Sequence, residues 1–584
     1  MQVERPKVQG EAAPKWVVFR DYLRRNPMLW KTLPLFVFLV GYILYPLIRT
    51  FIESFYTNQG ELSLANYRAF FNLERPANLE ALFTSIGLAA ASVVAAAAIG
   101  IPLAFLFTKF EFPGSRIFSR LVVIPMVFPP LISVLAYIFL YGEAGMVPKG
   151  LQDLFGLAKP PFVLKGLPGI LIIHAYTQFI YFYTMTSAAI SKVDASIDEA
   201  ARNLGGGFWF RMRKITLPLL TPGLVGASLL VFMIAINSFS APYLLGGSYR
   251  FLSMQVYVSK MNGNMAMAAT QASILAMISI IFLLLIRWYS QQRQYKMVGK
   301  GVSVHVTEIR NPWARYIAMI ISIVALVVLS LPQVTLFLIS LVPSGTWTTQ
   351  TFPPVYSWVN YKGLLRNPRL ATAVKNSLTM SSIATLGALV LGSIIAYFLS
   401  KKEFKTRWAM EVLTMLPWAL PGTIIAINLI IAFNQPTWLT LNHILVGTYW
   451  ILPLAYLVKI VPLITRSVFA VFEQLDESLE EAGRNLGGKW FYVFRRIIFP
   501  NILPGIASGA LLALVSTIGE FTSSIMLYTY SNKPMSMEIL DQMQNFNYGP
   551  AAAMGTIQVV LIAAVLIITG RLFGGEQTGG GIYF

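Results

Sequence analysis

Long apolar blocks alternate with short polar segments along the whole chain. Blocks such as 83–107 and 319–341 are almost continuously apolar, and each is longer than the about 20 residues that an α-helix needs to cross a bilayer. The alternation predicts twelve membrane-spanning helices, and therefore an all-α integral membrane protein. The predicted helices begin near Lys31, Phe83, Ser119, Pro168, Pro218, Ala269, Arg315, Ala373, Ala409, Ile444, Asn501 and Ala552.

The composition supports a membrane protein and explains its basic charge. Only 12% of the 584 residues are charged and 56% are hydrophobic, whereas soluble domains carry roughly 25% charged residues. A net charge of +20 is compatible with a nucleic-acid partner. The Lys and Arg residues gather between the apolar blocks, however, as the positive-inside rule describes. We therefore expect no nucleic acid as a partner.

The basic segments also predict the orientation of the chain. The segment before the first helix and the linker between the sixth and seventh helices are both rich in Lys and Arg. An even number of helices separates them, so both fall on one side, which the rule assigns to the cytoplasm. We expect a multi-pass membrane protein with a cytoplasmic N-terminus. Residues 16–30 are either an interfacial helix on that leaflet or a solvated basic tail.

The chain contains an internal repeat. Thr84-Ser85 matches Asn376-Ser377 at an offset of 292, and residues 198–206 match 480–488 at an offset of 282. Because each copy has six predicted helices, both copies insert with the same orientation, which predicts two six-helix bundles in parallel around an axis along the membrane normal. The predicted organisation is a basic cytoplasmic segment (1–30), a first half (31–290, with a cytoplasmic loop at 192–217), a cytoplasmic linker (291–312) and a second half (313–584, with a cytoplasmic loop at 474–499).

The two cytoplasmic loops carry the repeated polar motif. Each copy begins with Ser-x-x-Glu, which predicts a capping box at the start of a short helix. Each then reaches a glycine that supplies the left-handed residue at a helix end, and a basic amphipathic stretch leads back into the membrane. These residues are Ser196, Glu199 and Gly205 in the first copy, and Ser478, Glu481 and Gly487 in the second.

This loop resembles the signature of binding-protein-dependent ABC importer permeases, Glu-Ala-Ala, three residues, Gly, nine residues, Ile-x-Leu-Pro. The first copy matches at every position, and the second departs at Gly483 and Phe499. In that family the loop forms a coupling helix that lies in a groove of the ATPase subunit. The resemblance implies that the residues coupled to the ATPase are Glu199, Ala200, Ala201, Gly205, Glu481, Ala482, Gly483 and Gly487.

The resemblance also implies the partners and the activity. The chain has no Gly-x-x-x-x-Gly-Lys-Ser/Thr phosphate loop, so ATP and Mg would be bound by separate ATPase subunits, two copies of them, and this chain would hold no cofactor of its own. A solute-binding protein would dock on the outer face. The chain would be a transport permease of the bacterial inner membrane and not an enzyme.

The predicted substrate rests on a narrower resemblance. A fused chain of this length, with the segment 240–247, is most similar to the ferric-iron permeases. Thiamine, phosphonate, polyamine and sugar phosphate stay open as alternatives, and a secondary transporter with twelve helices is the alternative of a different class. With no cysteine in the chain and three histidines far apart in sequence, no metal site is predicted.

Polar residues at membrane depth are candidates for the translocation pathway, because ionisable groups are rare there. Glu520 either faces the substrate or lies at a helix end in contact with water, and Lys459 either snorkels or pairs internally. In the family, the segments equivalent to the end of each fifth helix line the central pathway. The candidate residues are Asn237, Ser238, Ser240, Thr517 and Glu520.

Prolines interrupt the third and ninth predicted helices. Such breaks either expose backbone carbonyl groups to a cavity or form kinks with no ligand role. The prolines are Pro125, Pro129, Pro130, Pro417 and Pro421.

Overall fold

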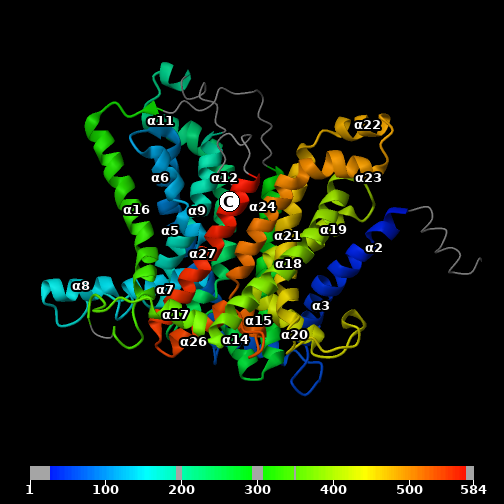
Figure 1. Ribbon diagram of the computed structural model, residues 1–584, viewed down its shortest axis with the longest axis horizontal. Coiled ribbons are helices and arrows are strands. Elements are labelled where there is room, and N and C mark those ends of the chain that lie inside the picture. The colour runs from blue at the N-terminus through cyan, green and yellow to red at the C-terminus, as the bar shows by residue number, and fades with distance from the viewer. Residues whose placement is uncertain (1–26, 192–199, 293–306, 348–349, 574–584) are drawn as a thin grey trace, which may run out of the picture.

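The computed structural model describes residues 27–191, 200–292, 307–347 and 350–573 (Figure 1). The described part is almost entirely helical, which confirms the predicted fold class. Within it, ten helices are long and apolar enough to cross a membrane, or eleven if the bent pair α19–α20 counts as one span. The fourth predicted span corresponds to α9 (Gly166–Ser191), which has 26 residues but is not among those ten. Residues 1–26, including most of the predicted interfacial helix, lie outside the described residues.

The helices of the first half run in the following order. They are α2 (Pro27–Leu39), η1 (Val40–Leu44), α3 (Tyr45–Glu53), α4 (Ala65–Phe70), α5 (Ala77–Lys109), α6 (Ser115–Leu121), η2 (Ile124–Val127), α7 (Pro130–Tyr141), α8 (Met146–Phe155), α9, α11 (Phe208–Arg211), η3 (Met212–Thr216), α12 (Leu217–Ile236), α13 (Ser240–Leu245), α14 (Leu252–Met261) and α15 (Met265–Gln292).

The second half repeats this order. Its helices are α16 (Pro312–Ser340), α17 (Val359–Arg366), α18 (Pro368–Lys401), α19 (Arg407–Ala419), α20 (Gly422–Phe433), η4 (Trp438–Thr440), α21 (Ile451–Gln474), α22 (Glu477–Asn485), α23 (Trp490–Val493), η5 (Phe494–Ile498), α24 (Phe499–Ile518), α25 (Ser524–Leu527), α26 (Met535–Gln544) and α27 (Tyr548–Phe573). A two-residue parallel pair, β1 (Phe110–Glu111) and β2 (Thr307–Glu308), ties the end of α5 to the linker.

Both halves break their third helix at the same place. α19 and α20 meet at 112° around Pro421, and α7 begins after Pro129, the equivalent residue at an offset of 292. The residue before each proline, Phe128 or Leu420, has extended backbone, because the proline ring disfavours the helical conformation there. The third predicted span is therefore not one continuous helix but two helical pieces on either side of a proline break.

The first helix of each half packs along the other half. α16 contacts α6 and α7 of the first half, and α3 contacts α20 of the second. Tyr176 on α9 donates a hydrogen bond to the carbonyl of Leu329 on α16 (3.0 Å), and Tyr42 donates to the carbonyl of Leu439 (2.6 Å). Figure 1 shows this exchange, with α16 beside α6 and α7, and with α2 and α3 beside α19 and α20. The two halves are thereby interlocked.

Glycine allows the second and fourth helices of each half to approach closely. A Cβ at Gly100 of α5 would lie 2.7 Å from the Cβ of Phe182 on α9. The equivalent Gly392 of α18 would place a Cβ 3.0 Å from Ile464 of α21. Small residues at helix crossings are typical of membrane bundles, because backbones can then pack directly against each other.

Replacing Gly100 with Val should therefore destabilise the protein by about 1–3 kcal/mol, the usual range for an overpacked core. Gly87 lies on the same helix, and a Cβ there meets nothing within 4 Å, so Gly87→Val is the matched control. The melting temperature of the purified protein measures both variants. Equal melting temperatures for the two variants would contradict the packing argument.

Candidate functional site

The two repeated loops lie on the same face of the protein, which we call the loop face. Figure 1 places α11 of the first loop and α22 and α23 of the second at that end, while α8, α14 and α26 lie at the opposite end. This placement is the one expected for a parallel repeat, in which both copies have the same orientation. Ser196 and Glu199 lie outside the described residues.

The second loop is fully described, and its helix α22 begins differently from the prediction. Asp476, not Ser478, is the N-cap, and its Oδ1 accepts a hydrogen bond from the backbone N–H of Ser478 (2.9 Å). The predicted capping box at Ser478 and Glu481 is therefore wrong, because an aspartate two residues earlier is an equally good N-cap. The backbone and side chain of Ser478 hydrogen-bond to Asp476 and hold its pKa below the ordinary value.

The glycines at the loop ends behave as predicted. Gly205 has a φ of 81° and Gly487 a φ of 82°, so both are in the left-handed region. In each copy the next glycine donates its backbone N–H back into the helix, Gly206 to the carbonyl of Ala201 (2.9 Å) and Gly488 to that of Gly483 (3.1 Å). Glycine favours this conformation because no Cβ opposes it.

Some of the remaining signature residues are exposed to solvent, and one is buried in the protein. Glu481 and Ala482 are exposed, as are Ala200 and Gly205, but Gly483 is buried. A Cβ at Gly483 would lie 2.5 Å from the Cδ1 of Ile497 in η5. Gly483 thus packs α22 against η5, the start of its own membrane helix.

Two leucines that the sequence analysis did not single out lie at the tips of the loops. Leu204 is 88% exposed and Leu486, its equivalent at an offset of 282, is 89% exposed. Trp209 (79%) and Phe491 (65%) extend the exposed apolar surface. Such patches mark interaction sites. The signal was the apolar residue directly before the helix-ending glycine in both copies.

Each loop joins its membrane helix through a π-helix. η3 precedes α12 and η5 precedes α24, at equivalent positions in the two halves. π-helical turns are rare and frequently occur at functional sites. The two turns lie between each loop and the fifth helix of its half.

The far ends of α12 and α24 meet the proline breaks of the opposite half. Asn237, after α12, donates a hydrogen bond to the carbonyl of Ala419 (3.4 Å), which precedes the break at Pro421. At the equivalent place after α24, a Cβ on Gly519 would lie 2.7 Å from Pro129. The carbonyl of Ala419 is thus bound by a residue of the other half instead of being exposed to a cavity.

The other pathway candidates make internal contacts. Ser240 and Thr517 are buried, and Thr517 donates its hydroxyl to the carbonyl of Ala513 (2.8 Å). Ser238 lies 3.0 Å from Nε2 of the buried His174. The structure brings all five candidates to the ends of α12 and α24, and their role in a pathway stays a prediction.

Glu520 forms a buried ion pair with Lys459. The carboxylate is 4% exposed and the Lys459 side chain 29%. One carboxylate oxygen also accepts hydrogen bonds from the Thr522 hydroxyl (2.6 Å) and from the Ser523 backbone and hydroxyl groups (3.0 and 2.8 Å). Glu520 lies at a helix end but is buried, so the alternative of contact with water is wrong. Of the two alternatives for Lys459, the structure shows internal pairing.

An aromatic cluster closes the space between the halves at this level. Phe239 and Phe521 are equivalent residues, both are buried, and their rings lie 5.9 Å apart. Tyr243 packs on Phe521 (6.2 Å) and on Tyr257 (5.7 Å). The axis of the repeat is therefore blocked by side chains near the face opposite the loops.

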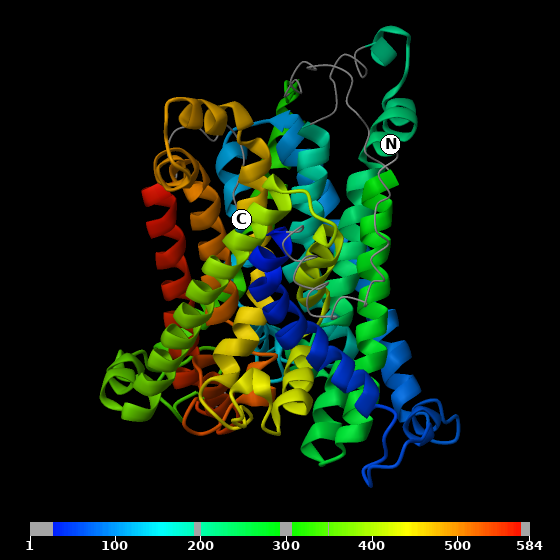
Figure 2. The ribbon, with the colours of Figure 1, turned by 90° about the vertical axis from the view of Figure 1, so that its right-hand side faces the viewer.

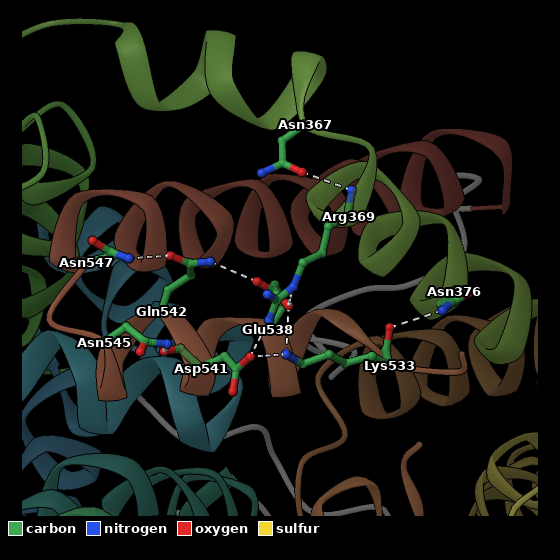
Figure 3. Close-up of polar contacts among 9 residues, drawn as sticks. All are labelled: Asn367, Arg369, Asn376, Lys533, Glu538, Asp541, Gln542, Asn545 and Asn547. Atoms are coloured by element: carbon green, nitrogen blue, oxygen red, sulfur yellow. Dashed lines mark hydrogen bonds and ion pairs between the residues drawn. The ribbon is translucent and has the colours of Figure 1, made fainter. Parts of the chain in front are cut away.

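A charged cluster on that opposite face clamps α26 to the start of α18 (Figure 3). Glu538 is fully buried, and one of its carboxylate oxygens lies 2.8 Å from Lys533 Nζ and 3.2 Å from Arg369 Nε. Asp541 pairs with the same two cations, and Gln542 donates to the other oxygen of Glu538 (2.8 Å). Every charge in the cluster has an opposite partner, which favours a structural clamp. Among the described residues, no group of three or more His, Cys, Asp or Glu side chains could hold a metal ion.

Comparisons with known proteins identify the repeated unit. A family model described as "Binding-protein-dependent transport system inner membrane component" matches residues 96–294 and again 388–574. A probable ABC transporter permease protein y4fN of Sinorhizobium fredii is 28% identical over 87% of this chain and 90% of its own length. The ferric transport system permease protein FbpB of Actinobacillus pleuropneumoniae is 25% identical over 90% of this chain and 75% of its own length. The sulfate transport system permease protein CysT of Escherichia coli is 28% identical, but over 36% of this chain and 79% of its own length.

The Lys459–Glu520 pair yields a prediction about stability. Lys459→Met should destabilise the protein by about 3–5 kcal/mol, because it leaves a buried carboxylate without a partner. The double variant Lys459→Met with Glu520→Gln should recover most of that loss. Arg116→Met is the control, since its pair with Glu111 is exposed and contributes little. The melting temperatures of the purified variants measure these effects. A double variant no more stable than Lys459→Met would show that the unpaired carboxylate is not the cause of the stability loss.

Proposed function

The chain belongs to the family of binding-protein-dependent transport system inner membrane components, and from that premise we propose that it passes ferric iron between its two halves. It is the permease of an ABC importer, a multi-pass inner-membrane transport component rather than a catalytic subunit. Membership of this family sets aside the secondary transporter.

The similarity along both halves to ferric transport permeases carries the substrate proposal. Relatives named for ferric transport align over 84–93% of this chain, so they share its fused two-half form. The sulfate permease aligns with little more than a third of it. No specific observation favours thiamine, phosphonate, polyamine or sugar phosphate. In this proposal a solute-binding protein selects the iron, and the permease provides a path rather than a tight metal site.

The loop face is the proposed docking surface for two ATPase subunits, and it would then be cytoplasmic. Leu204 and Leu486 project from it with almost no cover, and each loop offers one such leucine, so each half would receive one ATPase. The basic linker and the N-terminal segment belong to the same face in the predicted topology, in agreement with the positive-inside rule.

ATP-driven movement would reach the path through the π-helices. An ATPase that pulls on α22 displaces η5 and α24, and the same applies to η3 and α12 in the first half. The ends of these helices carry Phe239 and Phe521, whose contact blocks the axis. Separation of these two rings opens the face opposite the loops, which is a hinge-type change between two discrete packings.

The substrate proposal is tested by uptake of radioactive Fe³⁺ into liposomes. The permease is reconstituted with its ATPase subunits and its iron-loaded binding protein, with ATP inside. We expect uptake that needs both ATP and the binding protein. ATP-dependent uptake of sulfate or thiamine through their own binding proteins, with none of iron, would overturn the ferric assignment and leave the importer in place.

The docking proposal predicts a loss of partner binding. Leu204→Asp and Leu486→Asp place a charge in the centre of each proposed interface, and we expect each to weaken association with the ATPase roughly tenfold or more, as for other buried contact residues. Leu73, which is 83% exposed on the segment between α4 and α5, is the control as Leu73→Asp. Co-purification of the ATPase measures the effect. Full ATPase recovery with both loop variants would refute the proposed docking surface.

A further inference from the structure

A groove of about 790 Å³ lies on the flank of the second half, away from the axis between the halves. Its walls come from α2, α18, α21 and the continuous helix α23–η5–α24, and Figure 2 looks onto the side where α2 crosses in front of α18. Val390, Tyr397, Phe494 and Ile502 are among its apolar lining residues. The volume falls in the range of about 300–1,000 Å³ that is typical of ligand pockets.

The groove has a polar end, and that end lies at the membrane boundary. Lys31 is the second residue of the candidate span Trp30–Glu53, and Lys402 directly follows the span Pro368–Lys401. Trp490, another lining residue, begins the span Trp490–Ile518. Tryptophan and lysine at the ends of spans lie at the level of the lipid head groups. The groove therefore runs from the head-group level of the loop face into the hydrocarbon region.

The charge at the polar end of the groove indicates what kind of molecule binds there. Lys31 is exposed and Lys402 is partly exposed, and within the described residues neither forms an ion pair with a carboxylate. Among the described residues, no acidic side chain lines the groove. An anionic head group above an apolar chain has the complementary chemistry.

We propose that this groove binds one anionic phospholipid from the leaflet on the loop face. An acyl chain packs against the walls on α18 and α24, and the phosphate lies between Lys31 and Lys402. The apolar walls supply burial, and the two ammonium groups supply selectivity for a negative head group.

The bound lipid would support the second loop and not the first. Trp490 and Phe494 stack in the wall of the groove, with ring centroids 5.4 Å apart. Phe494 begins η5, whose Ile497 packs against Gly483 of α22. The residue equivalent to Lys402 in the first half is Phe110, so the head-group contact is not repeated. In this proposal the anionic lipid supports α22 of the second loop through Phe494 and η5, and the first loop has no equivalent support.

The test is lipid retention by the purified full transporter in nanodiscs of phosphatidylethanolamine and phosphatidylglycerol. Native mass spectrometry counts the phospholipids of each kind that stay bound. We expect one retained phosphatidylglycerol per transporter, and a roughly fivefold weaker retention for each lysine removed in Lys31→Gln and Lys402→Gln. Val390→Trp fills the groove and should remove the lipid whatever its head group. Lys149→Gln with Lys165→Gln, from the segment around α8, is the control with the same loss of charge.

The outcomes separate the proposal from its rivals. Loss of phosphatidylglycerol in the groove variants, with normal retention in the control, supports it. Unchanged retention in both the lysine variants and Val390→Trp overturns it, and so does equal retention of phosphatidylethanolamine by the unaltered protein. Because lipid retention requires no transport, the result does not depend on whether the substrate is iron.

Discussion

Every backbone N–H and C=O group inside a bilayer must find its hydrogen-bond partner within the protein, because lipid tails offer none. This constraint accounts for the nearly complete helicity of the described chain, and it gives the exceptions their meaning. The helix breaks at Pro129 and Pro421 free backbone groups at membrane depth. They occur where the other half of the protein can cover them, and Asn237 reaches the carbonyl of Ala419 across that boundary. The two halves exchange their first helices, and each half also contacts the end of the other's fifth helix. They therefore cannot be stable as separate bundles.

The two halves have the same helix arrangement, but they differ in the charged residues at several equivalent positions. Lys459 and Glu520 correspond to Thr177 and Ser238 in the first half, so the buried ion pair exists only in the second. The helices α14 and α26 begin 283 residues apart, so Lys533 corresponds to Arg250. Arg250 forms an exposed pair with Glu80, whereas Lys533 joins the buried cluster around Glu538. The buried pair and the clamp on α26 give the second half two buried charge contacts that the first half lacks at the equivalent positions.

Much of this architecture could be predicted from the sequence, because its determinants are local. Apolar blocks give the spans, and a glycine that ends a helix in both copies gives the left-handed turn at Gly205 and Gly487. Features that depend on distant contacts could not be predicted. Nothing near Asp476 distinguishes it from Ser478 as an N-cap, and the exchange of α3 and α16 is decided by packing between segments hundreds of residues apart. Glu520 at the end of α24 could be taken for a water-exposed residue, because its partner Lys459 is on another helix.

The same contacts explain how a force on the loop face could act near the opposite face. α12 and α24 each have 20 residues, so each spans about 30 Å at 1.5 Å per residue. One end of each helix is a π-turn attached to its own loop, and the other end rests on the proline break of the opposite half. A helix fixed at both ends links the two positions, although Pro222 in α12 and Pro504 in α24 each remove one backbone hydrogen bond from it. Because each helix ends on the other half, displacement of either loop acts on the boundary between the halves, where Phe239 and Phe521 meet.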